Sequence, residues 1–361
     1  MQLSSVQIFW MILIMEVGMT IIMTMSASID AAAQDMWISI IIASSIALVI
    51  AFITTKLSLL YPNETMVQFS EKILGKFIGK GIVIVYLVQF YTIIPIILRQ
   101  FSDMINELLL QNTPNFLIIL TMMMLVVYVT FIGKLQGIGR CSEVLGPLIV
   151  LLCLAVFILS LNNLDFKKIL PIYADHEIGD IVFGSLAPAS YLGHAVEFFM
   201  LTPFIVNKQK GARAAIWGVV VSCLIVIISA LFIILTVGSG VGNNMRYPFF
   251  EMTREISVGF LENVDPFVIG IWITSVFIKL SIYMFITSYA TAQLLRVHNW
   301  RLFIWVIPPF AITAALSLSY TFEATTHYLL NYWVPIVLPI NMIGLPLLLL
   351  IVGKIRQRHA H

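Results

Sequence analysis

Apolar runs of about 20 residues recur along the whole chain and are separated by short polar interruptions. A helix of that length crosses the hydrocarbon core of a bilayer, which is about 30 Å thick. The composition agrees, because 60% of the 361 residues are hydrophobic and 11% are charged, whereas soluble domains contain about 25% charged residues. The sequence therefore predicts one polytopic, all-α membrane domain over 1–361, with no separate soluble domain.

The apolar runs predict ten transmembrane helices. They lie near 8–29, 37–60, 81–105, 115–133, 142–161, 181–206, 214–237, 266–292, 302–320 and 332–353. Ten helices divide into two sets of five, and an odd number of crossings gives the second set the opposite orientation. This arithmetic is typical of an inverted repeat. We place the first repeat near 8–161 and the second near 181–353.

Lysine and arginine are concentrated on one side of the predicted bundle. If the N-terminus is cytoplasmic, 14 of the 20 basic residues lie in inner loops or the C-terminal tail, as the positive-inside rule requires. They are Lys56, Lys72, Lys76, Lys80, Lys134, Arg140, Lys208, Lys210, Arg213, Arg296, Arg301, Lys354, Arg356 and Arg358. Both termini are therefore predicted in the cytoplasm, with the long loops 162–180 and 238–265 outside. These loops are either solvated connections or a lid over an outward vestibule.

Composition and missing motifs exclude several functional classes. The net charge is only +2, and no basic patch is interleaved with aromatic residues, so no nucleic-acid partner is predicted. The sequence lacks the H-E-x-x-H, G-x-S-x-G and G-x-x-x-x-G-K-[ST] motifs, and we predict no catalytic residue, metal or cofactor. Cys141, Cys153 and Cys223 have no metal-binding spacing and are interpreted as inert thiols.

Four charged residues lie inside predicted spans and more than five residues from either span end. Glu16, Glu197 and Lys279 fall near mid-span, where an ionised side chain costs about 2.5–3.5 kcal/mol or more and needs a partner or a cavity. They form either a buried ion pair that fixes helix packing or a polar site at the bilayer midplane. Arg99 lies further outward, where it either snorkels to the interface or reaches an outer vestibule. We predict one intramembrane charge network of these four residues.

The sixth span contains residues that interrupt helices. Pro188 and Gly193 flank its centre, which predicts either a simple kink or an unwound segment that lines a pocket. The first span has only Gly18, followed by Thr20. Helix ends exposed by such breaks suit a zwitterionic amino acid, because N–H groups bind a carboxylate and carbonyls bind an ammonium.

These features predict a ligand site between the two broken helices. Its expected residues are Gly18, Thr20, Tyr191, Gly193 and Glu197. Glu197 would bind an amine or a sugar hydroxyl, or take up a proton. The residues leave these alternatives open.

Several short segments resemble the endospore germination permease family, the B subunits of spore-germinant receptors. The segments are Leu3-Ser4-Ser5-Val6-Gln7, Ala33-Gln34-Asp35-Met36-Trp37, Tyr61-Pro62, Glu64-Thr65, Glu71-Lys72-Ile73-Leu74-Gly75-Lys76, and Gly193 followed by Glu197. The family belongs to the amino acid/polyamine/organocation transporter superfamily. The resemblance therefore implies a LeuT-like 5+5 inverted repeat with broken helices 1 and 6. It also implies a receptor A subunit and a lipoprotein C subunit as partners in the spore inner membrane.

The sequence departs from this superfamily at two places. Amino-acid transporters carry a Gly-Ser-Gly-type run at the first break, where this chain has 16–20, Glu-Val-Gly-Met-Thr. The span 142–161 lacks the lysine of many sodium-independent members, and Lys279 is a candidate substitute for that charge. We predict a germinant-sensing subunit that binds a small nutrient, most favourably an amino acid. The alternatives are a proton-coupled amino-acid permease and a germinant-gated water or ion conduit.

Overall fold

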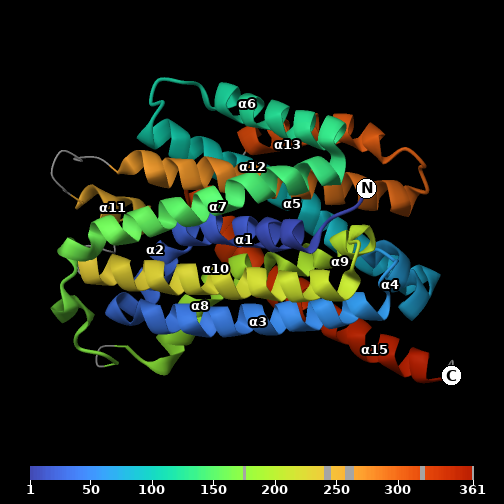
Figure 1. The fold of residues 1–361 in the computed structure, drawn as a ribbon, viewed down its shortest axis with the longest axis horizontal. Coiled ribbons are helices and arrows are strands. Elements are labelled where there is room, and N and C mark those ends of the chain that lie inside the picture. Colours follow the sequence, from blue (N-terminus) through green and yellow to red (C-terminus); the bar gives the residue numbers. More distant parts are fainter. Residues whose placement is uncertain (174–175, 240–244, 257–263, 318–321, 360–361) are drawn as a thin grey trace.

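The computed structural model describes residues 1–173, 176–239, 245–256, 264–317 and 322–359. The described chain is almost entirely helical, and most helices run along one common direction (Figure 1). Parts of the predicted loops 162–180 and 238–265, and the end of the predicted span 302–320, lie outside the described residues.

The first five predicted spans correspond to helices in the first half of the chain. The first span is divided into α1 (Ser5–Met23) and α2 (Met25–Ala32). The next four follow as α3 (Met36–Leu60), α5 (Lys76–Leu108), α6 (Asn115–Tyr128) with the π-helical η2 (Val129–Gly133), and α7 (Lys134–Ser160). The amphipathic α4 (Met66–Leu74) connects α3 to α5. Short 3-10 turns lie at η1 (Ala33–Asp35), η3 (Leu161–Asn163) and η4 (Phe166–Ile169).

The second five spans follow in the same order. The sixth is divided into α8 (Ile178–Leu192), the 3-10 helix η5 (Gly193–Glu197), α9 (Phe198–Leu201) and η6 (Thr202–Phe204). The others are α10 (Lys208–Thr236), α12 (Asp265–Leu295), α13 (Phe303–Ser317), and α14 (Phe322–Tyr328) joined through the π-helical η9 (Leu329–Gly344) to α15 (Leu345–His359). Between them lie α11 (Pro248–Arg254) and η8 (Trp300–Leu302).

Among the described residues, eight helical stretches are long and apolar enough to cross a membrane. This number is smaller than ten for two structural reasons. The predicted fourth and fifth spans belong to one continuous helical stretch, Asn115–Asn163, and the broken sixth span is divided into pieces that are each too short. All ten predicted spans therefore correspond to helical segments.

The central helix of the bundle is α1, which contacts α7, α10 and α12 (Figure 1). Every residue from Met11 to Met23 on it is buried. A helix that is apolar on all sides is expected in the interior, and the sequence of α1 has this pattern. The start of α1 and the end of α15 lie at one end of the bundle, which we call the terminus end, and α11 lies at the other (Figure 1).

Both predicted helix breaks exist, but each lies further along the chain than the sequence indicates. The first span bends at Thr24, between α1 and α2, and not near Gly18. Gly18 lies inside α1, where an added Cβ would come within 2.2 Å of the Ser275 hydroxyl of α12. Gly18 therefore permits close packing of two helices, as small residues do in membranes. In the sixth span, Pro188 stays within α8, and α-helical geometry ends at Gly193.

Candidate functional site

A buried polar cluster surrounds the break in the sixth span. The Tyr283 hydroxyl of α12 donates to Oε1 of Glu197 at 2.6 Å and lies 3.2 Å from Nδ1 of His194. The side-chain amide of Gln89, on α5, donates to the same Glu197 oxygen at 3.4 Å. All four side chains are fully buried, so the cluster lies in the interior of the bundle and not on its lipid-facing surface.

The 3-10 geometry of η5 brings His194 and Glu197 to one face. Residues three apart on a 3-10 helix lie above one another, whereas an α-helix would rotate them apart by about 60°. Gly193, at the start of η5, lets η9 approach closely, because an added Cβ would lie 2.6 Å from the Met342 sulfur of η9. The close approach of η9 and the tight turn of η5 together direct both polar side chains toward Tyr283.

Several buried polar atoms in and around this cluster have no hydrogen-bond partner among the described residues. Within the described chain, Oε2 of Glu197, Nε2 of His194 and Nζ of Lys279 are buried and make no hydrogen bond. Lys279 interacts electrostatically with both Glu197 and Glu16, and its Nζ lies 5.1 Å from the ring centroid of Tyr191. Buried charged groups are costly unless they are paired or hydrogen-bonded. These atoms are therefore suited to contact polar groups of a ligand.

Amide and aromatic side chains enclose the cluster. The Asn341 amide of η9 donates to Gln89 Oε1 at 2.8 Å, which holds the Gln89 amide toward Glu197. On another side, the Tyr191 and His194 rings stack with centroids 5.7 Å apart, and the edge-on Trp333 ring lies 5.4 Å from His194. The site therefore takes residues from α5, the broken sixth span, α12 and η9.

The structure brings together part of the predicted site. Tyr191, Gly193 and Glu197 lie in or beside the polar cluster, together with Lys279 of the predicted charge network. Glu16 is fully buried on α1 and joins them through its electrostatic interaction with Lys279.

Three other predicted residues have different surroundings. Gly18 packs against Ser275, as described above. The Thr20 hydroxyl donates to the Glu16 carbonyl of its own helix at 2.6 Å, so its proton is already bonded. Arg99 is buried and forms an ion pair with Asp103, one turn along α5, at 2.9 Å. Arg99 therefore pairs with an acid of its own helix, and its membership of the predicted charge network stays a prediction.

Sequence reasoning did not assign four residues of the cluster: Gln89, His194, Tyr283 and Trp333. Two of them carried a signal. His194 precedes Glu197 by three residues, and Tyr283 follows Lys279 by four, so that it shares a face of α12 with the buried lysine. Gln89 and Trp333 carried none, because their roles depend on contacts between distant helices.

The chain is similar in sequence to proteins of a known family. The family model described as "Spore germination protein" matches residues 2–343. The chain belongs to this spore germination protein family. Spore germination protein YndE of Bacillus subtilis (strain 168) is 24% identical over 326 residues, which cover 90% of this chain and 88% of that protein. Spore germination protein XB of Bacillus anthracis is 26% identical over 328 residues, covering 88% and 87% respectively.

Solved transporter structures share the fold of this spore germination protein. MhsT, whose structure was determined in complex with L-phenylalanine, aligns over 100% of both chains with a TM-score of 0.71 and 12% identity. A Na⁺-coupled sialic acid symporter aligns over 97% of this chain and 88% of its own, with a TM-score of 0.64 and 12% identity. These similarities show a LeuT-like fold.

A cavity of 640 Å³ opens at the end of the bundle opposite the termini. It is lined by Met23, Ser26, Ala27, Asp30, Ala31, Asp180, Phe183, Met245, Arg246, Thr326, Leu329 and Leu330. Arg246, which precedes α11, forms an ion pair with Glu107 of α5, and Phe249 and Phe250 of α11 are buried. The described part of loop 238–265 is thus anchored to the helices beside this cavity, which favours a covering segment over a solvated connection.

At the terminus end, the germination protein is closed by contacts of its first residues. The Leu3 amide donates to the Phe204 carbonyl at 2.7 Å, and the Val206 amide donates to the Leu3 carbonyl at 3.1 Å. These two bonds form a short parallel bridge between the start of the chain and the end of the sixth span. The Gln7 side chain also donates to Glu143 of α7 at 3.1 Å. These contacts tie the start of α1 to the end of the sixth span and to α7.

Proposed function

We propose that this protein is the germinant-sensing membrane subunit of a spore germination receptor and that it binds a small amino acid at the polar cluster. The observation that carries the proposal is that Glu197 and Lys279, two fully buried ionisable side chains of opposite sign, each keep an atom with no hydrogen-bond partner among the described residues. Oε2 of Glu197 can accept from an α-ammonium group, and Lys279 can donate to an α-carboxylate. The rings of Tyr191 and Trp333 can cover the apolar part of the ligand.

The proposed route to the site begins at the cavity opposite the termini. Met23 lines this cavity and is followed by the Thr24 bend, so the bend separates the cavity from the interior part of α1. The concentration of basic residues at the terminus end supports cytoplasmic termini, and hence an outward-facing cavity, in the spore inner membrane. The anchored α11 is then an external lid.

The proposed signal is a change in helix arrangement that the partner subunits detect. The short segments α9 and η6 connect Glu197 to Ile205, where the bridge to Leu3 closes the terminus end. A ligand that binds Glu197 more tightly in one arrangement shifts the equilibrium by that difference in affinity. We propose a receptor A subunit and a lipoprotein C subunit as the partners, on the basis of the family.

Glu197→Gln tests this proposal, because the change keeps the volume and removes the negative charge. Loss of a hydrogen bond to a charged group, worth about 1.5–3 kcal/mol, predicts a ligand affinity lower by roughly ten- to hundredfold. The affinity is measured for a panel of amino acids on the purified full chain, and the germinant dose-response is measured in spores beside immunoblots. Glu71→Gln, at the terminus end, is the matched control. Unchanged affinity and half-maximal germinant concentration at normal abundance would overturn the proposed site.

A second candidate function is a proton-coupled amino-acid permease. The hydrogen-bonded series His194, Tyr283 and Glu197 favours it, because adjacent titratable groups of this kind can pass a proton. Uptake of labelled amino acid into vesicles containing the purified protein, with and without a pH gradient, separates the candidates. Saturable binding without uptake is expected for the sensor, whereas gradient-driven accumulation would identify the permease.

A further inference from the structure

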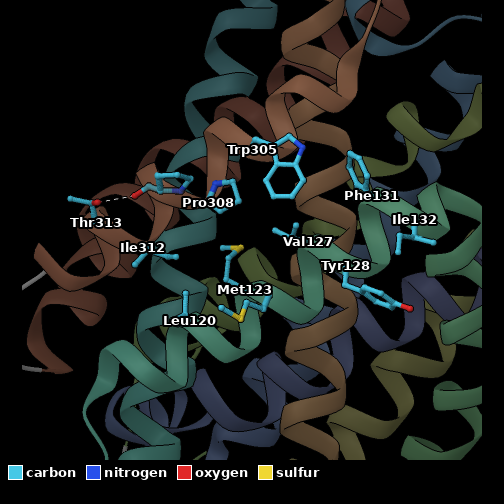
Figure 2. A pocket seen from close by; sticks show the side chains of 12 residues that line it. Leu120, Met123, Val127, Tyr128, Phe131, Ile132, Trp305, Pro308, Ile312 and Thr313 are labelled. Atoms are coloured by element: carbon cyan, nitrogen blue, oxygen red, sulfur yellow. Dashed lines mark hydrogen bonds between the residues drawn. The ribbon is translucent and has the colours of Figure 1, made fainter.

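An apolar groove runs between α6 and α13 on the outside of the bundle. Its volume is 710 Å³, within the range of about 300–1,000 Å³ found for small-molecule sites. Figure 2 shows Met123, Val127 and Phe131 on one wall and Trp305, Pro308 and Ile312 on the other. The Trp305 side chain is 59% exposed, so the groove opens toward the surroundings of the protein.

Irregular helix geometry creates this groove. On one side, α6 continues into the π-helical η2, which widens the turn. On the other side, α13 contains the adjacent prolines Pro308 and Pro309, which lack an N–H donor and bend helices. The two helices contact one another, but these distortions prevent close packing along their whole length.

The groove wall is mostly apolar: its side-chain polar groups are the Tyr128 hydroxyl, the Trp305 indole N–H and the Thr313 hydroxyl. Thr313 has the hydroxyl nearest the middle of α13, and it donates to the Pro309 carbonyl of its own helix at 2.8 Å (Figure 2). The remaining lining side chains there are aliphatic, thioether or aromatic. A hydrocarbon chain is the occupant that such a wall favours, because a polar occupant would lose its hydrogen bonds to water.

One end of the groove carries positive charge. The Arg301 guanidinium lies 5.5 Å from the Phe131 ring centroid, and that ring packs edge-on against Trp305 at 5.4 Å. Lys134 follows η2 directly and is half-buried. Within the described chain, neither cation forms an ion pair with a carboxylate. By the order of the crossings, both lie at the terminus end, where the basic residues are concentrated.

We propose that this groove binds an anionic phospholipid, with one acyl chain between α6 and α13 and the phosphate beside Arg301 and Lys134. The combination of a hydrocarbon-lined channel and unpaired cations at one end matches the two parts of such a lipid. Basic pockets between transmembrane helices at the inner leaflet bind anionic headgroups on the same principle. A partner helix would fill the apolar channel equally well but would leave the two cations without counterions.

The test uses native mass spectrometry of the purified full chain with phosphatidylglycerol or phosphatidylethanolamine of identical acyl chains. Wild-type protein is expected to retain phosphatidylglycerol preferentially. A cation near the membrane surface contributes about 1 kcal/mol to attraction of anionic lipid, so Arg301→Gln with Lys134→Gln should lower that affinity by roughly 25- to 30-fold. Arg213→Gln, an exposed basic residue at the same end, is the matched control and should change little.

A second variant separates the apolar channel from the charges. Val127→Trp adds a large ring in the groove and leaves both cations in place, so it should also reduce retention of phosphatidylglycerol. Equal retention of the two lipids by wild-type protein, or unchanged retention in the double Gln variant, would overturn the proposal. So would a Val127→Trp protein that loses a receptor subunit while it keeps the lipid, because the groove would then be a helix-docking surface.

Discussion

Tyr283→Phe removes one hydroxyl from the centre of the polar cluster and keeps the aromatic ring. The hydroxyl donates to Glu197 Oε1 at 2.6 Å and contacts Nδ1 of His194 at 3.2 Å. The Tyr283 ring also packs against Phe90 and His194, and these ring contacts remain possible for phenylalanine. The substitution therefore isolates the hydrogen bonds from the packing.

The expected loss follows from what remains after the hydroxyl is removed. Glu197 Oε1 would keep only the longer 3.4 Å bond from Gln89, and Oε2 has no partner among the described residues. Leaving a buried acceptor unsatisfied costs about 1–3 kcal/mol. Hydrogen bonds between membrane helices contribute about 0.6 kcal/mol on average, because the unfolded chain finds other partners in the membrane. We expect the loss in the free energy of unfolding to lie in the upper part of the range of about 1–3 kcal/mol, since Oε1 of Glu197 retains only one weak hydrogen bond.

The free energy of unfolding is measured in bilayer discs by steric trapping, for wild type, Tyr283→Phe, Glu197→Gln and the double variant. The double-mutant cycle gives the coupling between the two side chains, which should account for most of the Tyr283→Phe loss. Tyr289→Phe is the matched control, because its hydroxyl on the same helix makes no hydrogen bond with the described residues, and it should change stability by less than about 0.5 kcal/mol. A Tyr283→Phe loss no larger than that of the control, or a coupling near zero, would refute the reasoning.

Two further predictions concern charge and orientation. Lys279→Ala should destabilise the protein by about 3–5 kcal/mol because it leaves buried carboxylates without a counterion. Lys279→Arg should partly preserve stability and response. Wild-type abundance and germination in the Lys279→Ala variant would contradict this prediction. In a background without the native cysteines, Lys167→Cys should react with an impermeant thiol reagent in right-side-out vesicles and Gln209→Cys should not. The opposite labelling pattern would reverse the proposed orientation of the termini.

The fold could be predicted from the sequence because bilayer thickness fixes helix length. Ten apolar runs were enough to predict a helical bundle, whereas its LeuT-like arrangement was implied by the family resemblance. The positions of the helix breaks were harder to predict from the sequence. Pro188 is the strongest local breaker in the sixth span, yet it is accommodated within α8, and the change of geometry occurs at Gly193, where Met342 of η9 approaches. Contacts with a distant helix determine that position, and a local reading of the sequence does not contain them.

The candidate site was only partly predictable for the same reason. Glu197 and Lys279 were expected from the cost of placing charged groups at mid-span, and Tyr191 from its position in the predicted break of the sixth span. Gly18 was expected to open the first helix, because glycine tolerates unusual backbone angles. Instead, the Ser275 side chain of α12 occupies the space beside it, so the absence of a side chain serves helix packing. A glycine in a membrane helix thus has two opposite structural uses, and the neighbouring helix decides between them.

The two cations of the third and eighth spans show how a finer sequence rule would have separated structure from function. Arg99 has Asp103 four residues later, on the same helix face, and the two side chains pair within α5. Lys279 has Tyr283 at the corresponding position, so its own helix offers no carboxylate within one turn, and the acids that act on it electrostatically, Glu16 and Glu197, belong to other helices. A buried cation without an acid one turn away on its own helix therefore indicates an interhelical site. By this criterion, Lys279 is the cation that indicates an interhelical polar site.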